Sequence, residues 1–306
     1  MKRATILMMS VLSVGWQFST AQAEVKLERK FAPGSSYKNV VEVQSIQTLK
    51  LNNMDIDTNV SQTIVIETTV GDRAGDGQLQ IEHKIGSLRA QMTIPNLGEI
   101  KFDSTKPDEA TDSPLTPIFK ATANSTWQTV LNKDNEIVEV KGRDDLLNGL
   151  DENLKQFVKG QFDKEYLTEA ARKEAERIPA KPVEIDDTWE QSEAMRVDSS
   201  QVLTFDKTYT YRGTETYNGK ELDRIDVKAT AIKYEILPNS PIPLKVSDSN
   251  LKIGETTGKI YFDRELGRIV LDEQSHQVVG DFTLEVNDQK LPSVLDLRMT
   301  TNSREE

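Results

Sequence analysis

The chain has 306 residues, 50 of them acidic and 38 basic, and a formal net charge of −12. An acidic protein of this kind is a poor partner for nucleic acid or for an anionic membrane surface. The sequence contains no cysteine, which excludes disulfides, a thiolate nucleophile, cysteine-based zinc sites and a lipid-modified cysteine. Its stability must therefore come from burial of a large core.

The first 23 residues have the pattern of an export signal. Two cations open the chain, an apolar run covers residues 4–14, and Ala21-Gln22-Ala23 supplies small residues before a cleavage point. The apolar run is about half of the roughly 20 residues that a membrane-spanning helix needs. We therefore expect cleavage after Ala23, no membrane anchor in the mature chain, and an exported protein that is periplasmic or extracellular.

Residues 24–142 form a predicted N-terminal β-rich half. Apolar and polar residues alternate over most of residues 37–51, 60–70 and 79–94, as expected of strands with one face toward a core. Gly86 and Ser87 interrupt the last run and predict a hairpin turn. A segment rich in Asp, Pro, Ser and Thr, residues 103–117, predicts a break.

Residues 143–182 form a predicted helical connector. The apolar residues Leu147, Leu150, Leu154, Phe157 and Val158 recur at helical spacing after Asp144 and Asp145, which predicts a helix over residues 144–159. A second helix is predicted over residues 163–177, and the prolines that follow would end it.

Residues 183–306 form a predicted C-terminal β-rich half. Alternation resumes over residues 203–211, and Asn218-Gly219 predicts a hairpin turn. The apolar parity switches near Ala231, which predicts a β-bulge. Further strands are predicted over residues 278–286 and 295–299. Polar turns at residues 132–138 and 263–270 fit either a duplicated β unit or a chance recurrence of hairpin turns.

Together these elements predict an α+β fold. We expect a mostly antiparallel curved β-sheet in two similar halves, with a helical pair between them.

Only two histidines, His83 and His276, could supply the commonest general base. His83 shares the apolar parity of its strand, so a partly buried, hydrogen-bonded core histidine is favoured over a catalytic or metal-binding one. His276 lies in a polar stretch, and a surface strand position explains it as well as a functional role does.

Carboxylate and serine motifs also favour structural roles. Asp186-Asp187 precedes Trp189, but neighbouring strand residues point to opposite faces, so turn chemistry is favoured over glycoside hydrolysis. Asp55, Asp57 and Asn59 alternate like calcium ligands, yet the glycine and glutamate of a calcium loop are missing, so a polar turn is favoured. The acidic residues Asp103, Asp108, Glu109 and Asp112 and the serines Ser35 and Ser36 are assigned to solvated loops and turns. No catalytic, cofactor-binding or metal-binding residue is assigned.

Several short segments resemble an uncharacterised family of exported bacterial β-rich proteins, a domain-of-unknown-function family. They are residues 30–37 (KFAPGSSY), 185–189 (IDDTW), 209–215 (YTYRGTE) with Asn218-Gly219, and 258–263 (GKIYFD). Where that family usually has glycine before the acidic residue, this chain has Asp186. The resemblance implies export and architecture, and it transfers no catalytic residue.

The function that these observations favour is a non-enzymatic exported binding or carrier protein, without cofactor, that holds an apolar ligand or a peptide strand. The alternative is a structural or assembly protein of the cell envelope that acts through contacts with an envelope protein.

Overall fold

The computed structural model describes residues 24–51, 54–95, 97–196, 201–237, 244–286 and 289–306. Within these ranges, thirteen strands form one sheet. They are β1 (Ser36–Leu51), β2 (Met54–Arg73), β3 (Leu79–Ile94), β4 (Gly98–Asp103), β5 (Thr126–Leu131), β6 (Ile137–Lys141), β7 (Thr188–Arg196), β8 (Gln201–Tyr217), β9 (Lys220–Ile236), β10 (Leu244–Ser249), β11 (Lys252–Asp263), β12 (Arg268–Val286) and β13 (Gln289–Glu305). The helices are α1 (Thr116–Ala123), α2 (Glu152–Val158) and α3 (Lys164–Glu176), with 3-10 turns η1 (Pro107–Glu109), η2 (Asp144–Gly149) and η3 (Lys159–Phe162). The predicted export signal lies outside the described residues.

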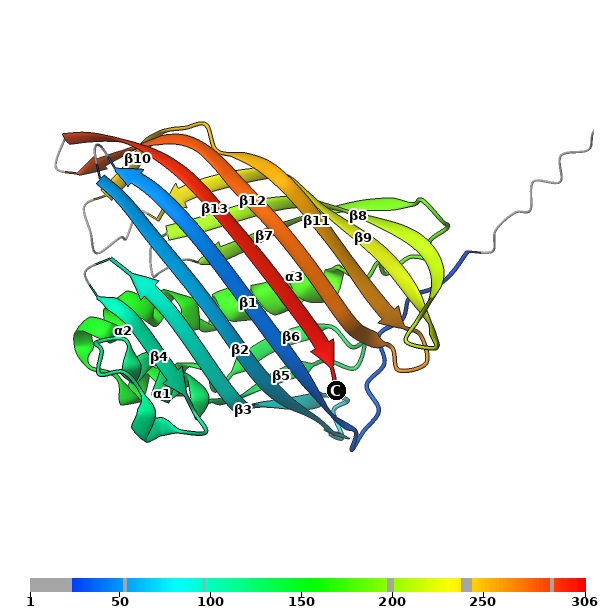
Figure 1. Cartoon of the computed structure of the whole chain (residues 1–306). Coiled ribbons are helices and arrows are strands. Elements are labelled where there is room, and N and C mark those ends of the chain that lie inside the picture. Colours follow the sequence, from blue (N-terminus) through cyan, green and yellow to red (C-terminus); the bar gives the residue numbers. More distant parts are fainter. Residues whose placement is uncertain (1–23, 52–53, 96, 197–200, 238–243, 287–288) are drawn as a thin grey trace, which may run out of the picture.

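The sheet joins strands from both predicted halves. Its order is β6-β5-β3-β2-β1-β13-β12-β11-β9-β8-β7, with β4 beside β3 and β10 beside β12. The first and last strands are antiparallel neighbours, so that Asn39 pairs with Glu305 and Leu51 with Ser293. Figure 1 shows the sheet curving around α3. The predicted α+β fold, a mostly antiparallel curved sheet with helices between two β-rich ranges, is confirmed.

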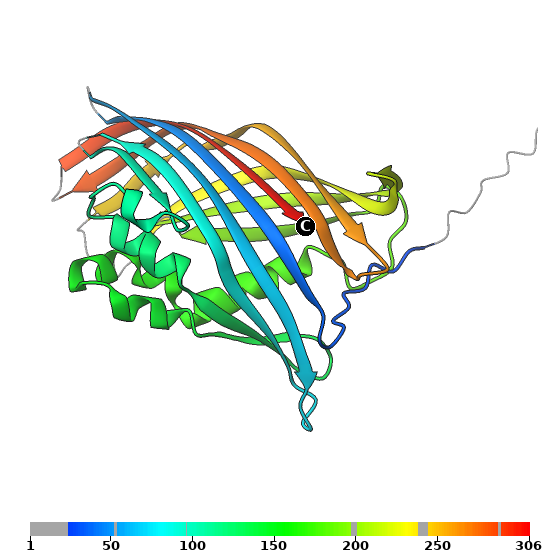
Figure 2. The ribbon, with the colours of Figure 1, turned by 60° about the horizontal axis from the view of Figure 1, so that its bottom comes forward.

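Helix α3 lies along the open side of the curved sheet. It contacts both β6 and β7, the strands at opposite ends of the sheet order. An apolar sheet face has to be covered by another element, and end strands need partners for their free backbone groups. Figure 2 shows the helices, in green, between the two sides of the sheet.

The apolar core along the inner face is divided into clusters. Tyr209 and Phe262 belong to one cluster and Phe205 and Val278 to another. Lys207, midway between Phe205 and Tyr209 on β8, is also buried. A polar layer therefore lies between two apolar layers.

Two turn-level predictions in the C-terminal half are confirmed. Asn218 and Gly219 link β8 to β9 with φ of 51° and 79°, the left-handed geometry that a two-residue hairpin of this kind requires. The bulge near Ala231 is also present: Asp206 pairs with Ala231 and Lys207 with Ala229, which leaves Thr230 without an opposite residue.

The predicted hairpin at Gly86-Ser87 is wrong. Strand β3 continues through both residues, and Gly86 forms a bulge because Ile66 pairs with Ile85 while Val65 pairs with Ser87. The bulge keeps Ile85 and Leu88 in one buried cluster, so the interruption in the alternation marks a kink within one strand.

The helix predicted over residues 144–159 is also wrong as a continuous element. It is divided into η2, α2 and η3. Leu150 is extended, with φ −104° and ψ 150°, and Asp151 starts α2 by accepting hydrogen bonds from the N–H groups of Asn153 and Leu154. Capping by Asp151 satisfies free N–H groups and sets a new helix start. The second predicted helix is confirmed as α3.

Candidate functional site

A cavity of about 460 Å³ lies between α3 and the strands that surround it. The segment before β1, strands β1, β2, β3, β5 and β6, and the β11–β12 hairpin complete its wall. Most lining residues are hydrophobic: Phe31, Tyr37, Ile66, Ile81, Trp127, Leu131, Ile137, Val140, Leu167, Ala170, Ala171, Ala175, Ile178, Phe262 and Ile269. The polar lining residues are Arg29, Asn39, Thr68, His83, Thr129, Arg143, Glu174 and Arg268.

The helix side of this cavity is built largely from small side chains. Asp163 caps α3 by accepting a hydrogen bond from the Tyr166 N–H at 2.8 Å. Ala170, Ala171 and Ala175 then line the cavity. Alanine favours the helical conformation and occupies little volume. Helix α3 can therefore border the cavity without filling it.

His83 belongs to the sheet side of the cavity. Its Nδ1 lies 3.1 Å from the Thr68 hydroxyl and its Nε2 3.1 Å from the Thr129 hydroxyl, and its ring stacks on Trp127 with 5.0 Å between centroids. Burial, and then the charge of Arg143, lower the pKa of His83 to about 4. His83 is thus a neutral, hydrogen-bonded and partly buried histidine, as predicted.

Three arginines line the cavity and differ in their anionic partners. Arg268 donates to both carboxylate oxygens of Glu305 at 2.6 Å. Burial lowers the pKa of Arg29, and the charge of Glu174 opposes that shift. Arg143 has no ion pair within the described residues, and its buried Nε has no hydrogen-bond partner there. The cavity wall thus includes a guanidinium that no described side chain neutralises.

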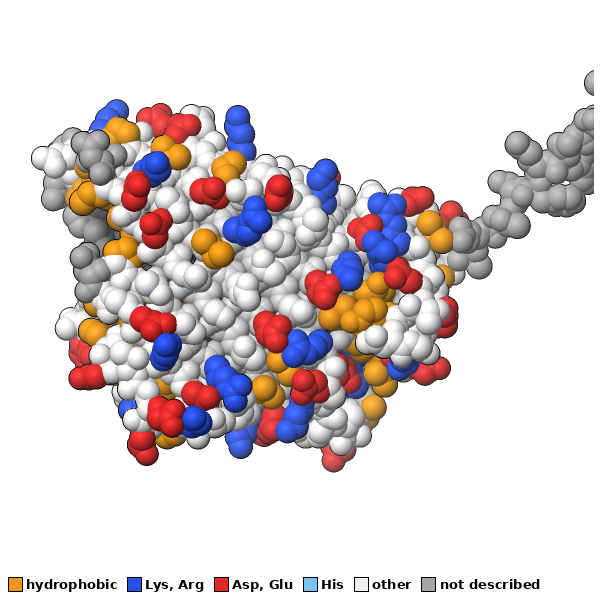
Figure 3. Space-filling model, viewed as in Figure 1, with side chains coloured by type: hydrophobic (Ala, Val, Ile, Leu, Met, Phe, Trp, Pro, Cys, Tyr) orange, Lys and Arg blue, Asp and Glu red, His pale blue; other side chains and the backbone are white. Residues whose placement is uncertain are grey.

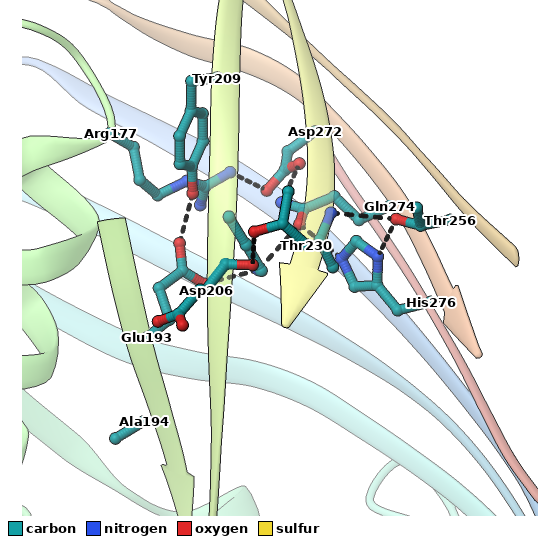
Figure 4. A network of polar contacts seen from close by, with 12 residues as sticks. Arg177, Glu193, Ala194, Asp206, Tyr209, Thr230, Thr256, Asp272, Gln274 and His276 are labelled. Carbon is teal, nitrogen blue, oxygen red and sulfur yellow. Dashed lines mark hydrogen bonds and ion pairs between the residues drawn. The ribbon is translucent and has the colours of Figure 1, made fainter. Parts of the chain in front are cut away.

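A polar network crosses the inner face beside the C-terminal end of α3 (Figure 4). Arg177 donates from Nη2 to Asp272 Oδ2 at 2.5 Å. Lys207 donates to Glu193 Oε2 at 2.6 Å and to Gln274 Oε1 at 3.0 Å. The remaining contacts are Tyr209 to Glu193, Gln274 to Asp272 at 2.8 Å, and His276 to Thr256 at 2.8 Å and to Gln274 at 3.1 Å.

The charges of this network compensate one another. Burial alone would lower the pKa of Arg177, but Asp272 and other nearby anions raise it above its ordinary value. Burial alone would raise the pKa of Glu193, but Lys207 and other partners bring it below its ordinary range. Burial, and then the charge of Lys207, lower the pKa of His276 to about 4. Paired in this way, the groups serve to hold helix and sheet together.

The prediction that His276 occupies a surface strand position is wrong. The residue is buried and lies close to the ring of Phe205, with centroids 6.0 Å apart. Its neighbours Asp272 and Gln274 also belong to the interior network. A polar layer inside the sheet gives the same sequence pattern as a solvated face, which explains the error.

The predicted turn at Asp186-Asp187 is confirmed. Asp186 has φ 71°, its N–H donates to the Tyr211 carbonyl at 2.8 Å, and the Tyr211 N–H donates to the Asp187 carbonyl at 3.0 Å. The exposed carboxylate of Asp186 forms an ion pair with Arg212. Trp189 instead stacks on Tyr209, with centroids 5.7 Å apart.

The predicted polar turn at Asp55, Asp57 and Asn59 is wrong, because all three residues lie within β2. Pairing with β1, including a hydrogen bond from Thr48 to Asp57 at 2.7 Å, holds this stretch as a strand. Across the described residues, no group of three or more histidine, aspartate or glutamate side chains is placed to hold a metal ion.

Sequence reasoning did not identify Arg143 or Trp127 as members of a site. The Arg143 Cζ lies 4.4 Å from the centroid of Trp127 and 5.4 Å from that of Phe162. Trp127 is on β5, whereas Arg143 and Phe162 come from the predicted connector. No sequence spacing links these positions; only the tertiary fold brings them together.

In the view of Figure 3, acidic and basic side chains are interspersed over the surface, with exposed hydrophobic side chains between them in places. This distribution agrees with a surface whose charges favour solubility. Among the described helices, none is both long and apolar enough to cross a membrane.

Comparison with solved structures gives distant likenesses. Lipovitellin, from a structure of its lipid-protein interactions, has 10% sequence identity and a TM-score of 0.45 over 90% of this chain. An outer membrane channel from Pseudomonas putida F1 has 8% identity and a TM-score of 0.26, covering 91% of this chain and 98% of the channel. A DUF1329 family protein from Desulfovibrio piger has 8% identity and a TM-score of 0.14, covering 88% of this chain and 85% of that protein. The chain spans 25% of lipovitellin, and at these low TM-scores none of the likenesses bears on function.

No curated protein is similar to this chain in sequence. Residues 76–267 match a protein family described as a family of unknown function, DUF6263. This match includes the IDDTW, YTYRGTE and GKIYFD segments, and it confirms the predicted resemblance to a domain-of-unknown-function family. The chain belongs to the DUF6263 family.

Proposed function

We propose that this protein is an exported, non-enzymatic binding or carrier protein that holds the apolar part of a ligand between α3 and the curved sheet. The observation that carries the proposal is the cavity of about 460 Å³ with its mostly hydrophobic wall. This volume falls in the range of roughly 300–1,000 Å³ typical of small-molecule sites. Apolar surface removed from water contributes about 25 cal/mol per Å², so a hydrophobic chain in this space would be bound favourably.

The chemistry around the cavity supports binding over conversion. His83 is neutral near pH 7, and each of its ring nitrogens is within hydrogen-bond distance of a threonine hydroxyl. A general base needs a free nitrogen within reach of a substrate proton. The groups of the Arg177 network are likewise bonded to one another.

A fluorescent apolar probe, N-phenyl-1-naphthylamine, tests the proposal on residues 24–306. Ala171→Leu adds volume inside the cavity, and Glu165→Leu adds the same side chain at an exposed position of α3 that does not line it. We expect saturable binding to the parent and to Glu165→Leu, and about tenfold weaker binding to Ala171→Leu, equivalent to ~1.4 kcal/mol. Absence of saturable binding to the parent chain would overturn the proposal.

Export is tested separately by fractionating the source cells and sequencing the protein's N-terminus. We expect a chain that begins at Glu24 in the envelope or the medium. A chain that retains Met1 in the cytoplasm would contradict export but not ligand binding. A ligand that co-purifies should have the same mass before and after incubation with the protein, because binding alone does not change a ligand chemically.

A further inference from the structure

Arg143 is placed in the cavity wall by a local backbone feature and by two aromatic rings. Gly142 precedes it with φ +88°, a conformation that other residues rarely adopt. The guanidinium then lies over Trp127 and near Phe162, at 4.4 and 5.4 Å from the ring centroids. Stacking of this kind uses the face of the guanidinium. Because Nε is buried, the in-plane N–H donors available to a ligand are those of the two Nη atoms.

The anionic side chains near the cavity do not pair with Arg143. Glu305 binds Arg268 through both oxygens. The charge of Glu174 raises the pKa of Arg29 against the effect of burial, although no ion pair joins these two groups in the described part of the chain. Within the described residues, no carboxylate forms an ion pair with Arg143, and its Nε is buried without an acceptor. Its pKa is lowered by burial, with no opposing contribution from an anion.

An uncompensated cation in such a place costs free energy. Arg143 is half-buried, and its Nε atom is removed from water without an acceptor, so the cation has lost part of the hydration that would otherwise stabilise it. A carboxylate or phosphate matches the planar fork of arginine and forms charge-assisted hydrogen bonds with it. The apolar wall next to Arg143 would accommodate a hydrocarbon chain attached to that anion.

We propose that Arg143 binds the anionic head group, a carboxylate or a phosphate, of an amphiphile whose apolar chain occupies the cavity. This inference rests on the proposed function and gives the chemical class of its ligand. It makes Arg143 the residue that distinguishes charged from uncharged amphiphiles.

The test compares three ligands with the same twelve-carbon chain: dodecanoate, dodecyl phosphate and dodecanol. Binding to residues 24–306 is measured by calorimetry at pH 8, below the micelle concentration. We expect at least one of the two anions to bind about tenfold tighter than dodecanol, as a charge-assisted pair would provide. The anion that binds more tightly identifies the head group as carboxylate or phosphate.

Variants assign this preference to one residue. Arg143→Gln should remove the preference for the anion while the affinity for dodecanol stays within about twofold. Retained dodecanol binding also shows that the variant is folded. Arg298→Gln, at an exposed arginine that pairs with Glu255 on the surface, is the matched control and should behave like the parent.

The possible failures are distinguishable. Equal binding of dodecanol and both anions by the parent chain would overturn the role of Arg143 and leave the proposed function standing. A preference for the anion that remains in Arg143→Gln would also overturn the role of Arg143 and leave the proposed function standing. If none of the three ligands binds, both the proposed function and the inference are overturned.

Discussion

Tyr166 and Thr168, two residues apart on α3, hydrogen-bond the backbones of strands at opposite ends of the sheet. The Tyr166 hydroxyl accepts from the Arg196 N–H at 3.1 Å and donates to the Ala194 carbonyl at 3.3 Å, both on β7. The Thr168 hydroxyl accepts from the Val140 N–H of β6 at 3.0 Å. Side chains of one helix therefore substitute for the missing neighbours of two end strands.

Removing the Tyr166 hydroxyl and removing the Thr168 hydroxyl should lower the free energy of unfolding by different amounts. Thr168→Val leaves the buried Val140 N–H without an acceptor, and we expect a loss of about 1–3 kcal/mol in the free energy of unfolding. Tyr166→Phe affects a more exposed contact and should cost about 0.5–1.5 kcal/mol. Urea denaturation measures both values, and hydrogen exchange at Val140 should accelerate only in Thr168→Val. Unchanged exchange at that amide would show that α3 does not protect β6.

The buried pair of Arg177 and Asp272 should be sensitive to removal of either partner. Arg177→Met or Asp272→Leu alone leaves a charge in the interior without its partner. Each substitution is therefore expected to lower the free energy of unfolding by about 3–5 kcal/mol. The double variant should be more stable than the sum of the two effects predicts, because it leaves neither charge unpaired.

The exposed pair of Arg298 and Glu255 provides the control for this cycle. Arg298→Met should change the free energy of unfolding by less than about 1 kcal/mol, as is usual for surface ion pairs. A cost for Arg177→Met as small as that of Arg298→Met would show that the interior network contributes little to stability.

The free energy of unfolding should decrease as the pH is lowered from 6.5, the ordinary pKa of histidine, to about 4, the pKa of His83 and His276. Burial lowers the pKa of both from 6.5 to about 4. Below pH 6.5 the unfolded chain binds protons that the folded chain does not, so the free energy of unfolding decreases until about pH 4. Each histidine should contribute roughly 3 kcal/mol to this loss.

Thermal and urea unfolding between pH 4 and 7 measures this dependence. In the double variant His83→Gln/His276→Gln, glutamine cannot titrate and retains hydrogen-bonding capacity toward the threonines. The decrease in stability on acidification should be smaller than in the parent chain. Equal decreases in parent and variant would assign the pH dependence to carboxylates such as Glu193, whose pKa lies below its ordinary range.

Gly142 should affect stability and ligand selectivity together. A Cβ at this position would lie 3.3 Å from the Thr126 carbonyl oxygen in a left-handed conformation, so Gly142→Ala should cost about 1–2 kcal/mol. Gly149 has open space around it and no positive φ, so Gly149→Ala should be nearly neutral. We also expect Gly142→Ala, but not Gly149→Ala, to weaken the preference for anionic ligands. Identical behaviour of the two variants would refute a positioning role for Gly142.

Much of the sheet could be predicted from the sequence because strands such as β3 and β8 alternate between buried and more exposed residues. The same signal correctly predicts the bulge near Ala231 and wrongly predicts a hairpin at Gly86. In both places a bulge shifts the parity of the apolar residues, but the glycine and serine at Gly86 also resemble a turn. Parity alone does not separate a kinked strand from two strands.

The helices and the site were less predictable. Leu150 is buried in an apolar cluster in an extended conformation, and Asp151 caps a new helix directly after it. Helix α1 has Pro117 in its first turn, within a stretch expected to be irregular. Proline fits a helix start as well as a loop. Arg143 meets Trp127 only after β5, β6 and the connector are placed, so no local pattern indicates the contact.

The pairing of β1 with β13 also determines when the sheet can be completed. The middle of the sheet joins residues 39–51 to residues 293–305, so β1 lacks its partner on this side until β13 has been synthesised. Contacts between such distant positions incur a large loop-closure cost before they stabilise anything, and chains dominated by them fold slowly. The strands on either side of this pairing, β1-β2-β3-β5-β6 and β7-β8-β9-β11-β12-β13, are paired in chain order, so each group can form before β13 reaches β1. The two groups become one sheet only when residues 293–305 are available to pair with residues 39–51.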